Sequence, residues 1–500
     1  MCVAKRHCRT SWLPAPRDPI PARAVQQVSL ERRRRPVLFS PREPRCGGVF
    51  GCAVLDGFCS GHERPGSCMN PRSLLAAATF LALGATAPAA IKATTPDYLR
   101  RAEEAIAKAD FDAALTALEG LLKIEPENVA ARVWRARILA DKGEVEKAVS
   151  ELEDVLRKDP KNAEALAQRG YLRQKSGRID EALADFNAAL RSNPRDDWTL
   201  YCRGLIYAGR GDGYAALGDL DAALEINPRN AGARLGRGQV RLFRQEWDLA
   251  EADFDAAVRI DPKNPAAHAG MGAASYGMGA YKQALEAFTE VVALLPKDSR
   301  PLVERGNALA ALKDFDKARA DYDAALAVNP KEAHAFTGKG DLARVQKKWD
   351  EAVKDYTAAL AVDAENYRAL MGRAAAHQAS GAAEQALADY TESVKRFPEE
   401  AQPFNDFAWL LATSPADKVR DGNRAVELAA KACEMTRWEN GAYLDTLAAA
   451  HAERGNFEDA LKWQNEAVKQ SGDEPPEVQE EMKSRVELYR GKKAFRELPE

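Results

Sequence analysis

The chain has 500 residues, of which 46% are hydrophobic, 29% charged and only 7% aromatic, and because its apolar share leans on Ala and Leu the composition predicts an all-helical protein. Residues 1–68 hold twelve basic and five acidic side chains and Arg72 adds one positive charge, so the overall formal charge of −3 leaves −11 for residues 91–500. That excess of negative charge argues against a nucleic-acid partner, whose phosphates require a basic surface.

Residues 1–68 are rich in Pro and Arg, include the basic block Arg32–Arg35, and show no helical or strand period. We expect this segment to be mistranslated upstream sequence or a disordered extension, with the true start at Met69. The alternative is a basic tail that binds nucleic acid.

Residues 69–90 have the pattern of a secretory signal peptide. Arg72 supplies a positive charge, the run Leu74–Leu83 is apolar, and small residues around Ala87 provide a cleavage pattern. A ten-residue apolar run is too short to cross a bilayer, which takes about 20 residues. The segment therefore predicts an exported protein of the periplasm or cell envelope, with no stable membrane span after signal cleavage.

From residue 95 onward the sequence repeats with a period of 34. Prolines mark the period at Pro126, Pro160, Pro194, Pro228, Pro262, Pro296 and Pro330, and Pro398 returns in register after one gap. The units begin at residues 95, 129, 163, 197, 231, 265, 299, 333 and 367. Each unit has a small residue at position 8 and Ala at position 20, and position 24 is usually aromatic.

These positions resemble those of the tetratricopeptide repeat (TPR) family. The resemblance implies an all-α, right-handed superhelical solenoid of about eleven TPR helical hairpins within residues 91–472. The last two hairpins are expected at Phe404–Thr436, with extra residues between its helices, and at Gly441–Gly472. Residues 473–500 are expected to supply a C-terminal capping helix, Glu477–Tyr489, and a tail.

Opposite charges recur inside the repeat. Position 7 is Arg or Lys in eight units, and position 23 is acidic in seven. The unit starting at 265 loses both charges together, with Met271 and Ala287, which predicts an ion pair between the two helices of each unit. Exchange of both members, as in Arg237→Met with Asp253→Ala, should then be nearly neutral. The alternative is an arginine ladder that binds an anionic ligand.

In the TPR family, unit positions 2, 5, 9, 12 and 13 line the concave face. Units three to six are rich in large apolar side chains at these positions, which favours a protein or peptide as partner. The candidate binding residues are Tyr171, Trp198, Tyr201, Leu205, Leu235, Phe243 and Tyr276. For any single one of them, packing against a neighbouring helix is the alternative.

The sequence offers no convincing catalytic, cofactor or metal site. After residue 68 each His stands alone in its unit, and only Cys202 and Cys433 remain, too far apart in a linear array to form a disulfide. The run Gly211–Ala216 matches a dinucleotide-binding loop, but that motif requires a preceding strand, whereas here a turn between two helices is expected.

The block Asn405–Pro415 and the run Leu444–Ala450 resemble the C-terminal part of exported bacterial TPR proteins. The sequence thus predicts a non-enzymatic scaffold or adaptor in the bacterial cell envelope. The alternative is a regulatory or targeting subunit of an envelope enzyme complex. A more distant alternative is an enzyme whose site lies in the insertion at 413–423.

Overall fold

The computed structural model describes residues 94–472 and 475–497, and every regular element within them is an α-helix. Twenty-three helices, α2 to α24, follow one another along these residues as eleven successive pairs and a final single helix. The expected all-α class, the helical hairpins and the C-terminal capping helix are confirmed. The predicted extension (1–68) and signal peptide (69–90) lie outside the described residues.

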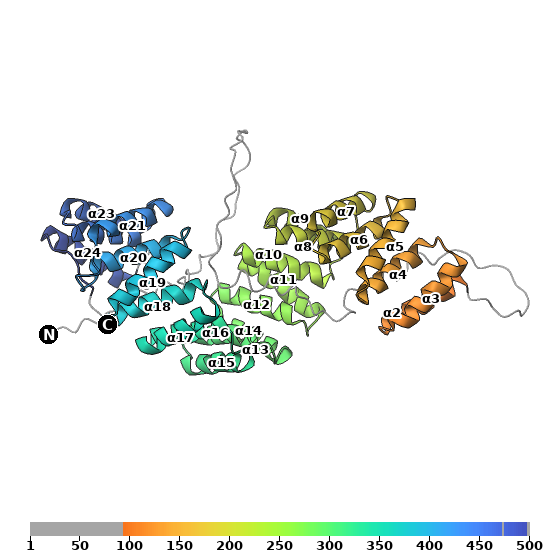
Figure 1. Cartoon of the computed structure of the whole chain (residues 1–500), viewed down its shortest axis with the longest axis horizontal. Coiled ribbons are helices and arrows are strands. Elements are labelled where there is room, and N and C mark those ends of the chain that lie inside the picture. Colours follow the sequence, from red (N-terminus) through yellow and green to blue (C-terminus); the bar gives the residue numbers. More distant parts are fainter. Residues whose placement is uncertain (1–93, 473–474, 498–500) are drawn as a thin grey trace, which may run out of the picture. The chain divides into compact units, whose positions relative to one another are not determined.

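The chain divides into two compact units between Gly279 and Ala280, in the middle of the sixth repeat. The first, called here the N-terminal unit, contains α2 to α12, which are labelled in Figure 1. Their bounds are α2 Thr95–Ala107, α3 Phe111–Ile124, α4 Val129–Asp141, α5 Val145–Lys158, α6 Ala163–Lys175, α7 Ile179–Ser192, α8 Asp197–Gly209, α9 Gly213–Ile226, α10 Ala231–Phe243, α11 Trp247–Ile260 and α12 Pro265–Gly277.

The second, called here the C-terminal unit, contains α13 to α24. Their bounds are α13 Tyr281–Leu294, α14 Arg300–Ala311, α15 Phe315–Val328, α16 Ala333–Val345, α17 Trp349–Val362, α18 Tyr367–Ala379, α19 Ala383–Arg396, α20 Ala401–Thr413, α21 Gly422–Met435, α22 Gly441–Glu453, α23 Phe457–Gln470 and α24 Pro476–Arg490.

Local sequence signals set where the helices begin and where they turn. Asn side chains accept a backbone N–H from the first turn of the following helix, at Asn128, Asn162, Asn230, Asn264 and Asn366. The turn inside a hairpin requires a residue with positive φ. That residue is Gly143 (φ 84°) in the second repeat and Lys347 (φ 59°) in the eighth.

The aromatic residue at position 24 packs between two glycines of successive first helices. In the N-terminal unit, a Cβ on Gly238 would lie 2.9 Å from Phe254 Cζ, and one on Gly270 would lie 2.5 Å from Phe254 Cδ1. In the C-terminal unit, Gly338 gives the same close approach to Tyr322. A side chain at these glycines would displace the ring, so Gly238 at position 8 and the glycines at position 6 permit this close packing.

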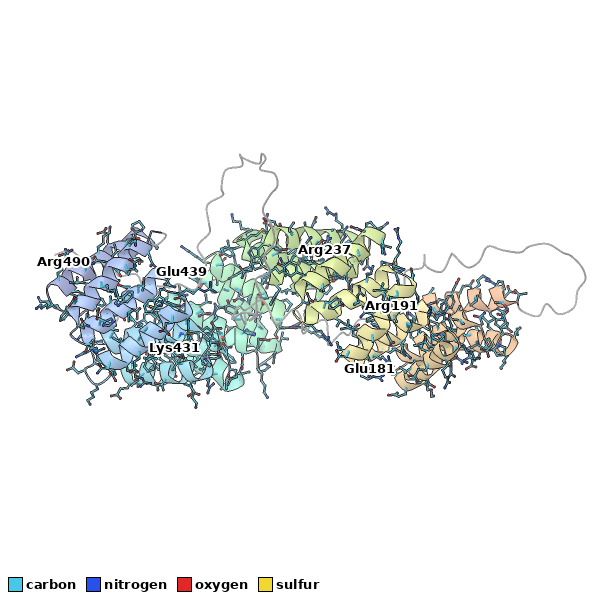
Figure 2. All side chains as sticks on the ribbon, turned by 90° about the horizontal axis from the view of Figure 1, so that it is seen from above. Glu181, Arg191, Arg237, Lys431, Glu439 and Arg490 are labelled. Carbon is cyan, nitrogen blue, oxygen red and sulfur yellow. The ribbon has the colours of Figure 1, made fainter. Side chains whose placement is uncertain are left out.

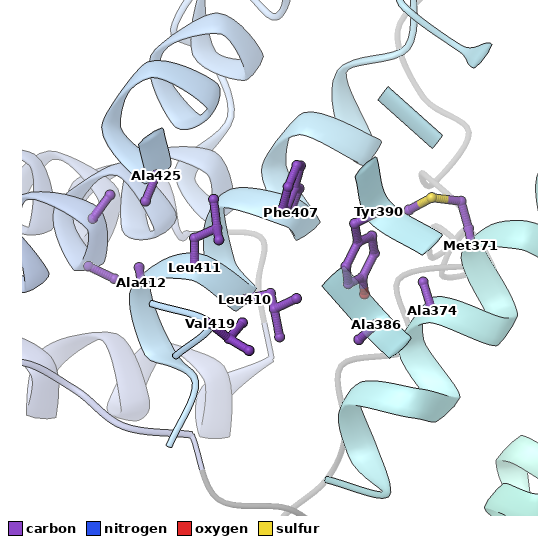
Figure 3. Close-up of a cluster of buried hydrophobic side chains, with 12 residues drawn as sticks. Met371, Ala374, Ala386, Tyr390, Phe407, Leu410, Leu411, Ala412, Val419 and Ala425 are labelled. Atoms are coloured by element: carbon purple, nitrogen blue, oxygen red, sulfur yellow. The ribbon is translucent and has the colours of Figure 1, made fainter. Parts of the chain in front are cut away.

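The insertion of the tenth repeat, residues 414–421, is folded onto the C-terminal unit. Val419 is 3% exposed and joins the cluster that contains Leu410, Tyr390 and Phe407, and Figure 3 shows its side chain beside Leu410. Arg420 donates to the Ser414 carbonyl at 2.9 Å. The insertion is thus part of a hydrophobic core.

The capping helix α24 is attached through a buried ion pair. Arg485, 3% exposed, donates from Nε and Nη2 to the two carboxylate oxygens of Asp445 on α22 at 2.8 and 2.9 Å. Gln464 on α23 donates to the same carboxylate at 2.7 Å. These bonds compensate the desolvation of both charges and fix α24 against α22 and α23.

Candidate functional site

The charges of the N-terminal unit form hydrogen-bonded groups around buried carboxylates. Arg237, labelled in Figure 2, donates from Nε and Nη2 to Asp253 at 2.9 and 2.6 Å. Its Nη1 donates to Asp221 of the preceding repeat at 2.6 Å. Hydrogen bonding to Asp253 raises the pKa of Arg237. All three nitrogens of this guanidinium therefore bond to carboxylates of the chain itself.

The same pairing of positions 7 and 23 recurs in other repeats. It joins Arg135 to Glu151, Arg169 to Asp185, Arg203 to Asp219, Arg305 to Asp321 and Arg373 to Asp389. Lys339 differs from the expectation, because it pairs with Asp323 of the preceding repeat at 2.8 Å. Burial raises the pKa of Asp355, the partner expected for Lys339.

A second arginine on the first helix was missed from the sequence. Arg241 donates to Asp253 at 2.7 Å, and Arg173 donates to Asp185 at 2.7 Å. Both lie one helical turn after the arginine at position 7, on the same side of their helix. The arginines of the first helices thus bond to carboxylates within their own repeat and, for Arg237, of the preceding repeat. These contacts favour a role in holding the helices together over a ladder that binds an anionic ligand.

The seven candidate binding residues, called here the aromatic face, all lie in the N-terminal unit, on α6, α8, α10 and α12. Tyr171 and Trp198 are half-buried, and their ring centroids lie 5.5 Å apart at 58°. Lys175 Nζ lies 5.2 Å from the centroid of the Tyr171 ring. The structure thus brings two of the predicted rings together on successive first helices, beside a cation.

Other members of the aromatic face pack against their neighbours. A Cβ on Gly232 would lie 2.9 Å from Tyr201 Cζ, and a Cβ on Gly236 would lie 2.9 Å from Leu205 Cδ2. Leu235 is only 6% exposed and belongs to the core around Phe254. These residues therefore contribute packing between α8, α10 and α11, and Leu235 offers little surface to a ligand.

The largest accessible surface of the aromatic face belongs to Phe243. Its side chain is 54% exposed at the end of α10, whereas Tyr276 on α12 is half-buried. Tyr214, 79% exposed on α9, was not predicted, and Arg244 lies over its ring at 4.6 Å. The other eight regular repeats hold a charged residue at this position, acidic in seven of them, so the repeat pattern gives no indication of an aromatic ring at residue 214.

Titratable groups of the described residues do not converge on a common pocket. Burial lowers the pKa of His377 and of His451. The ring of His268 forms a hydrogen bond with the Pro262 carbonyl at 2.9 Å. No group of three or more His, Cys, Asp or Glu in the described ranges has the geometry of a metal site. Within the same ranges, no helix combines the length and apolar character needed to span a membrane.

The segment resembling a dinucleotide-binding loop is a turn between α8 and α9. Asp212 caps α9 by accepting the Ala215 N–H at 3.0 Å, and Gly211 has a φ of 79°. The loop is preceded by a helix, so it lacks the strand that the cofactor motif requires.

Comparison with known protein families identifies the repeat. Two tetratricopeptide-repeat models match the chain, one over residues 105–170 and the other over 167–231, 201–265, 270–333, 303–357 and 337–401. Together they span most of the nine regular repeats, and the chain therefore belongs to the tetratricopeptide-repeat family, whose domains bind proteins and peptides. No curated protein matches this chain.

Three solved structures illustrate the likeness. A TPR protein from Parabacteroides merdae is 25% identical, over 47% of this chain and 93% of its own, with a TM-score of 0.35. Yeast Tom70 is 14% identical, over 79% and 95%, with a TM-score of 0.43. YrrB, described as a TPR protein with an unusual peptide-binding site, is 22% identical, over 38% and 97%, with a TM-score of 0.33.

Proposed function

We propose that this protein is a non-enzymatic scaffold or adaptor that binds a protein or peptide on the aromatic face of its N-terminal unit. One observation carries the proposal: the Tyr171–Trp198 ring pair and the exposed Phe243 stand on consecutive first helices of a rigid repeat array. Rings held in this way bury apolar area on binding with little loss of conformational entropy.

The test compares Phe243→Ala with Ile124→Ala in protein purified with its partners from the native host. Ile124 is 56% exposed at the end of α3, so it is a matched control for the loss of an exposed apolar side chain. We expect the Phe243 variant to lose partners that the Ile124 variant retains, with unchanged helicity in both. Identical partner sets from the two variants would remove the aromatic face as the binding surface.

The nature of the retained partners separates the two functional alternatives. A scaffold retains proteins or peptides without a fixed enzyme component. A regulatory or targeting subunit instead co-purifies with one enzyme in constant stoichiometry, and that activity should fall in the Phe243→Ala variant. Mass spectrometry with quantification of each component distinguishes these results.

We also propose that the protein is exported to the bacterial cell envelope. The support is the signal-peptide pattern of residues 69–90 and the resemblance of Asn405–Pro415 to exported repeat proteins. Fractionation of the native host, followed by N-terminal sequencing, should find a mature end between Pro88 and Ile91. Abundant peptides from residues 24–45 in the cytoplasmic fraction would contradict both the export and the start at Met69.

A further inference from the structure

The chain's own C-terminal tail lies against first helices of the C-terminal unit. Two side-chain donors, Gln378 Nε2 on α18 and Trp409 Nε1 on α20, both bond to Oε2 of Glu497 at 2.7 Å. The backbone N–H of Glu497 donates to the Thr413 carbonyl at 2.9 Å. Neutral N–H groups from two helices thus converge on one carboxylate, which is anchored by its own backbone as well.

The tail residue two positions earlier fills an apolar site. The Phe495 ring lies 5.8 Å from the Trp409 ring at 42°, and it packs on the cluster that includes Ala452 and Tyr489. The Arg485 guanidinium lies 5.3 Å from the Phe495 centroid and 5.6 Å from that of Trp409. Because the buried Asp445 holds Arg485 in place, this cation is a fixed part of the site.

Between these two residues, Arg496 points to a different partner. It forms an ion pair with Glu453 of α22 at 2.5 Å, and Glu453 also binds Arg420 of the insertion at 2.9 Å. Residues 493–497 have no regular secondary structure. An extended segment therefore presents its aromatic ring and its carboxylate from alternate residues, in the way that an extended peptide occupies a groove.

The two donors and the backbone acceptor stand at positions expected to line the concave face in TPR proteins. Gln378 is the twelfth residue of its repeat, and Trp409 and Thr413, whose carbonyl accepts the Glu497 N–H, are the ninth and thirteenth residues of α20. The inner-face positions of these helices are therefore occupied by a segment of the chain that follows the last helix.

We propose that the surface formed by Gln378, Trp409 and Arg485 is a second binding site, for an extended peptide with an aromatic residue two positions before a carboxylate. Residues 494–497 occupy this site in the isolated protein, and a partner peptide of the same chemistry binds by displacing them. The site lies in the C-terminal unit, so the inference stands independently of the function proposed for the aromatic face.

The contacts are suited to displacement. The two donors to Glu497 are uncharged, so they regain water when the carboxylate leaves. Glu497 also lies near the half-buried carboxyl of Asp406, whose pKa is raised to about 6, mainly by loss of hydration and in part by Glu497. At neutral pH this like charge opposes the bound tail.

The test uses a fluorescent synthetic peptide with the sequence of residues 491–500 and a chain that ends at Lys492. Fluorescence anisotropy should show that the peptide binds the truncated chain. Its affinity for the full chain should be lower by a factor of about ten or more, because only the molecules whose own tail is displaced can bind the peptide. Peptides with Phe495→Ala or Glu497→Gln should each bind about tenfold or more weakly. Equal binding to the two chains would overturn the occupation of the site by the tail.

A second variant guards against misfolding of the truncated chain. The full chain with Phe495→Ala and Glu497→Gln keeps α24 and its Asp445–Arg485 pair, and it should bind the wild-type peptide with cooperative melting retained. Adding Gln378→Met, which removes a donor at similar volume, should weaken that binding. If neither the truncated chain nor this variant binds the peptide, the tail is a structural part of the cap and the proposal fails.

Phe243→Ala provides the remaining control. This change lies in the N-terminal unit, so the affinity for the tail peptide should not change. Loss of partner binding at the aromatic face and loss of peptide binding at the tail site can therefore be observed separately.

Discussion

The burial of Asp253 predicts an unequal cost for two similar substitutions in the N-terminal unit. Asp253 is 2% exposed and accepts hydrogen bonds from Arg237 and Arg241, whereas Asp219 is 8% exposed and accepts them from Arg203. Replacing Asp219 by Ala leaves the partly buried Arg203 without a carboxylate, with only its bond to Asn187, which costs about 3 kcal/mol. Replacing Asp253 by Ala leaves Arg237 with its bond to Asp221 alone, and it also breaks the charged bond to Arg241, which adds about 1.5 kcal/mol.

The second arginine also changes the expectation for the double substitution. Arg237→Met with Asp253→Ala leaves Arg241 without its carboxylate acceptor and with only a long bond to the Leu249 carbonyl, so we expect a loss of about 2 kcal/mol rather than a neutral result. Adding Arg241→Leu removes that unpaired charge and should restore most of the stability.

Urea denaturation followed by circular dichroism measures these differences, and hydrogen exchange of amides in α10 and α11 assigns them to the fifth repeat. The local measurement is needed because repeat arrays unfold in parts. Equal losses for Asp253→Ala and Asp219→Ala would refute the reasoning, since the second arginine would then contribute nothing.

Three further predictions concern the C-terminal unit. Gly338→Ala should cost about 2 kcal/mol in thermal unfolding, because its Cβ would lie 2.5 Å from Tyr322 Cζ, and an unchanged melting temperature would contradict the close packing. Lys347→Gly should raise the free energy of unfolding by about 1 kcal/mol, because the φ of Lys347 is 59° and glycine adopts this angle without strain. Gly381→Ala, at a φ of 82°, should lower it by about the same amount. Changes of the same sign would show that φ is not the cause. Asp406 has its folded pKa raised to about 6, above the ordinary value of 3.8, so its contribution favours the folded state below pH 3.8 and is lost as the pH rises through 6. Asp406→Asn should flatten this part of the stability profile between pH 4 and 7, and a profile that keeps the same slope would assign it to other groups.

The sequence located most of the helices because their determinants are local. The 34-residue period places the first helix of a repeat at Thr95, Val129 and Ala163, and the structure begins α2, α4 and α6 at these residues. At position 8, Gly238 allows close approach of the Phe254 ring at position 24, and that ring fills the gap between successive repeats. A repeating pattern is readable without a structure because every unit meets the same packing requirement.

Departures from the period were harder to predict. Arg241 and Arg173 occur in only some repeats, so their bonds to Asp253 and Asp185 have no periodic signal. For Leu235 the sequence left binding and packing open, and its burial favours packing, because a position assigned to one face of a helix says nothing about how the next helix covers it.

By itself, the sequence determined the helical repeat, the family and, except at Lys339, the ion pairs between positions 7 and 23, since each depends on residues less than one repeat apart. Only the tertiary structure placed Glu497 against Gln378 and Trp409, which are 119 and 88 residues away in the chain. The tail has neither helical period nor repeat position to indicate its partners. Its site exists only where α18, α20, α22 and α24 pack together, because donors from separate helices converge only after those helices are assembled.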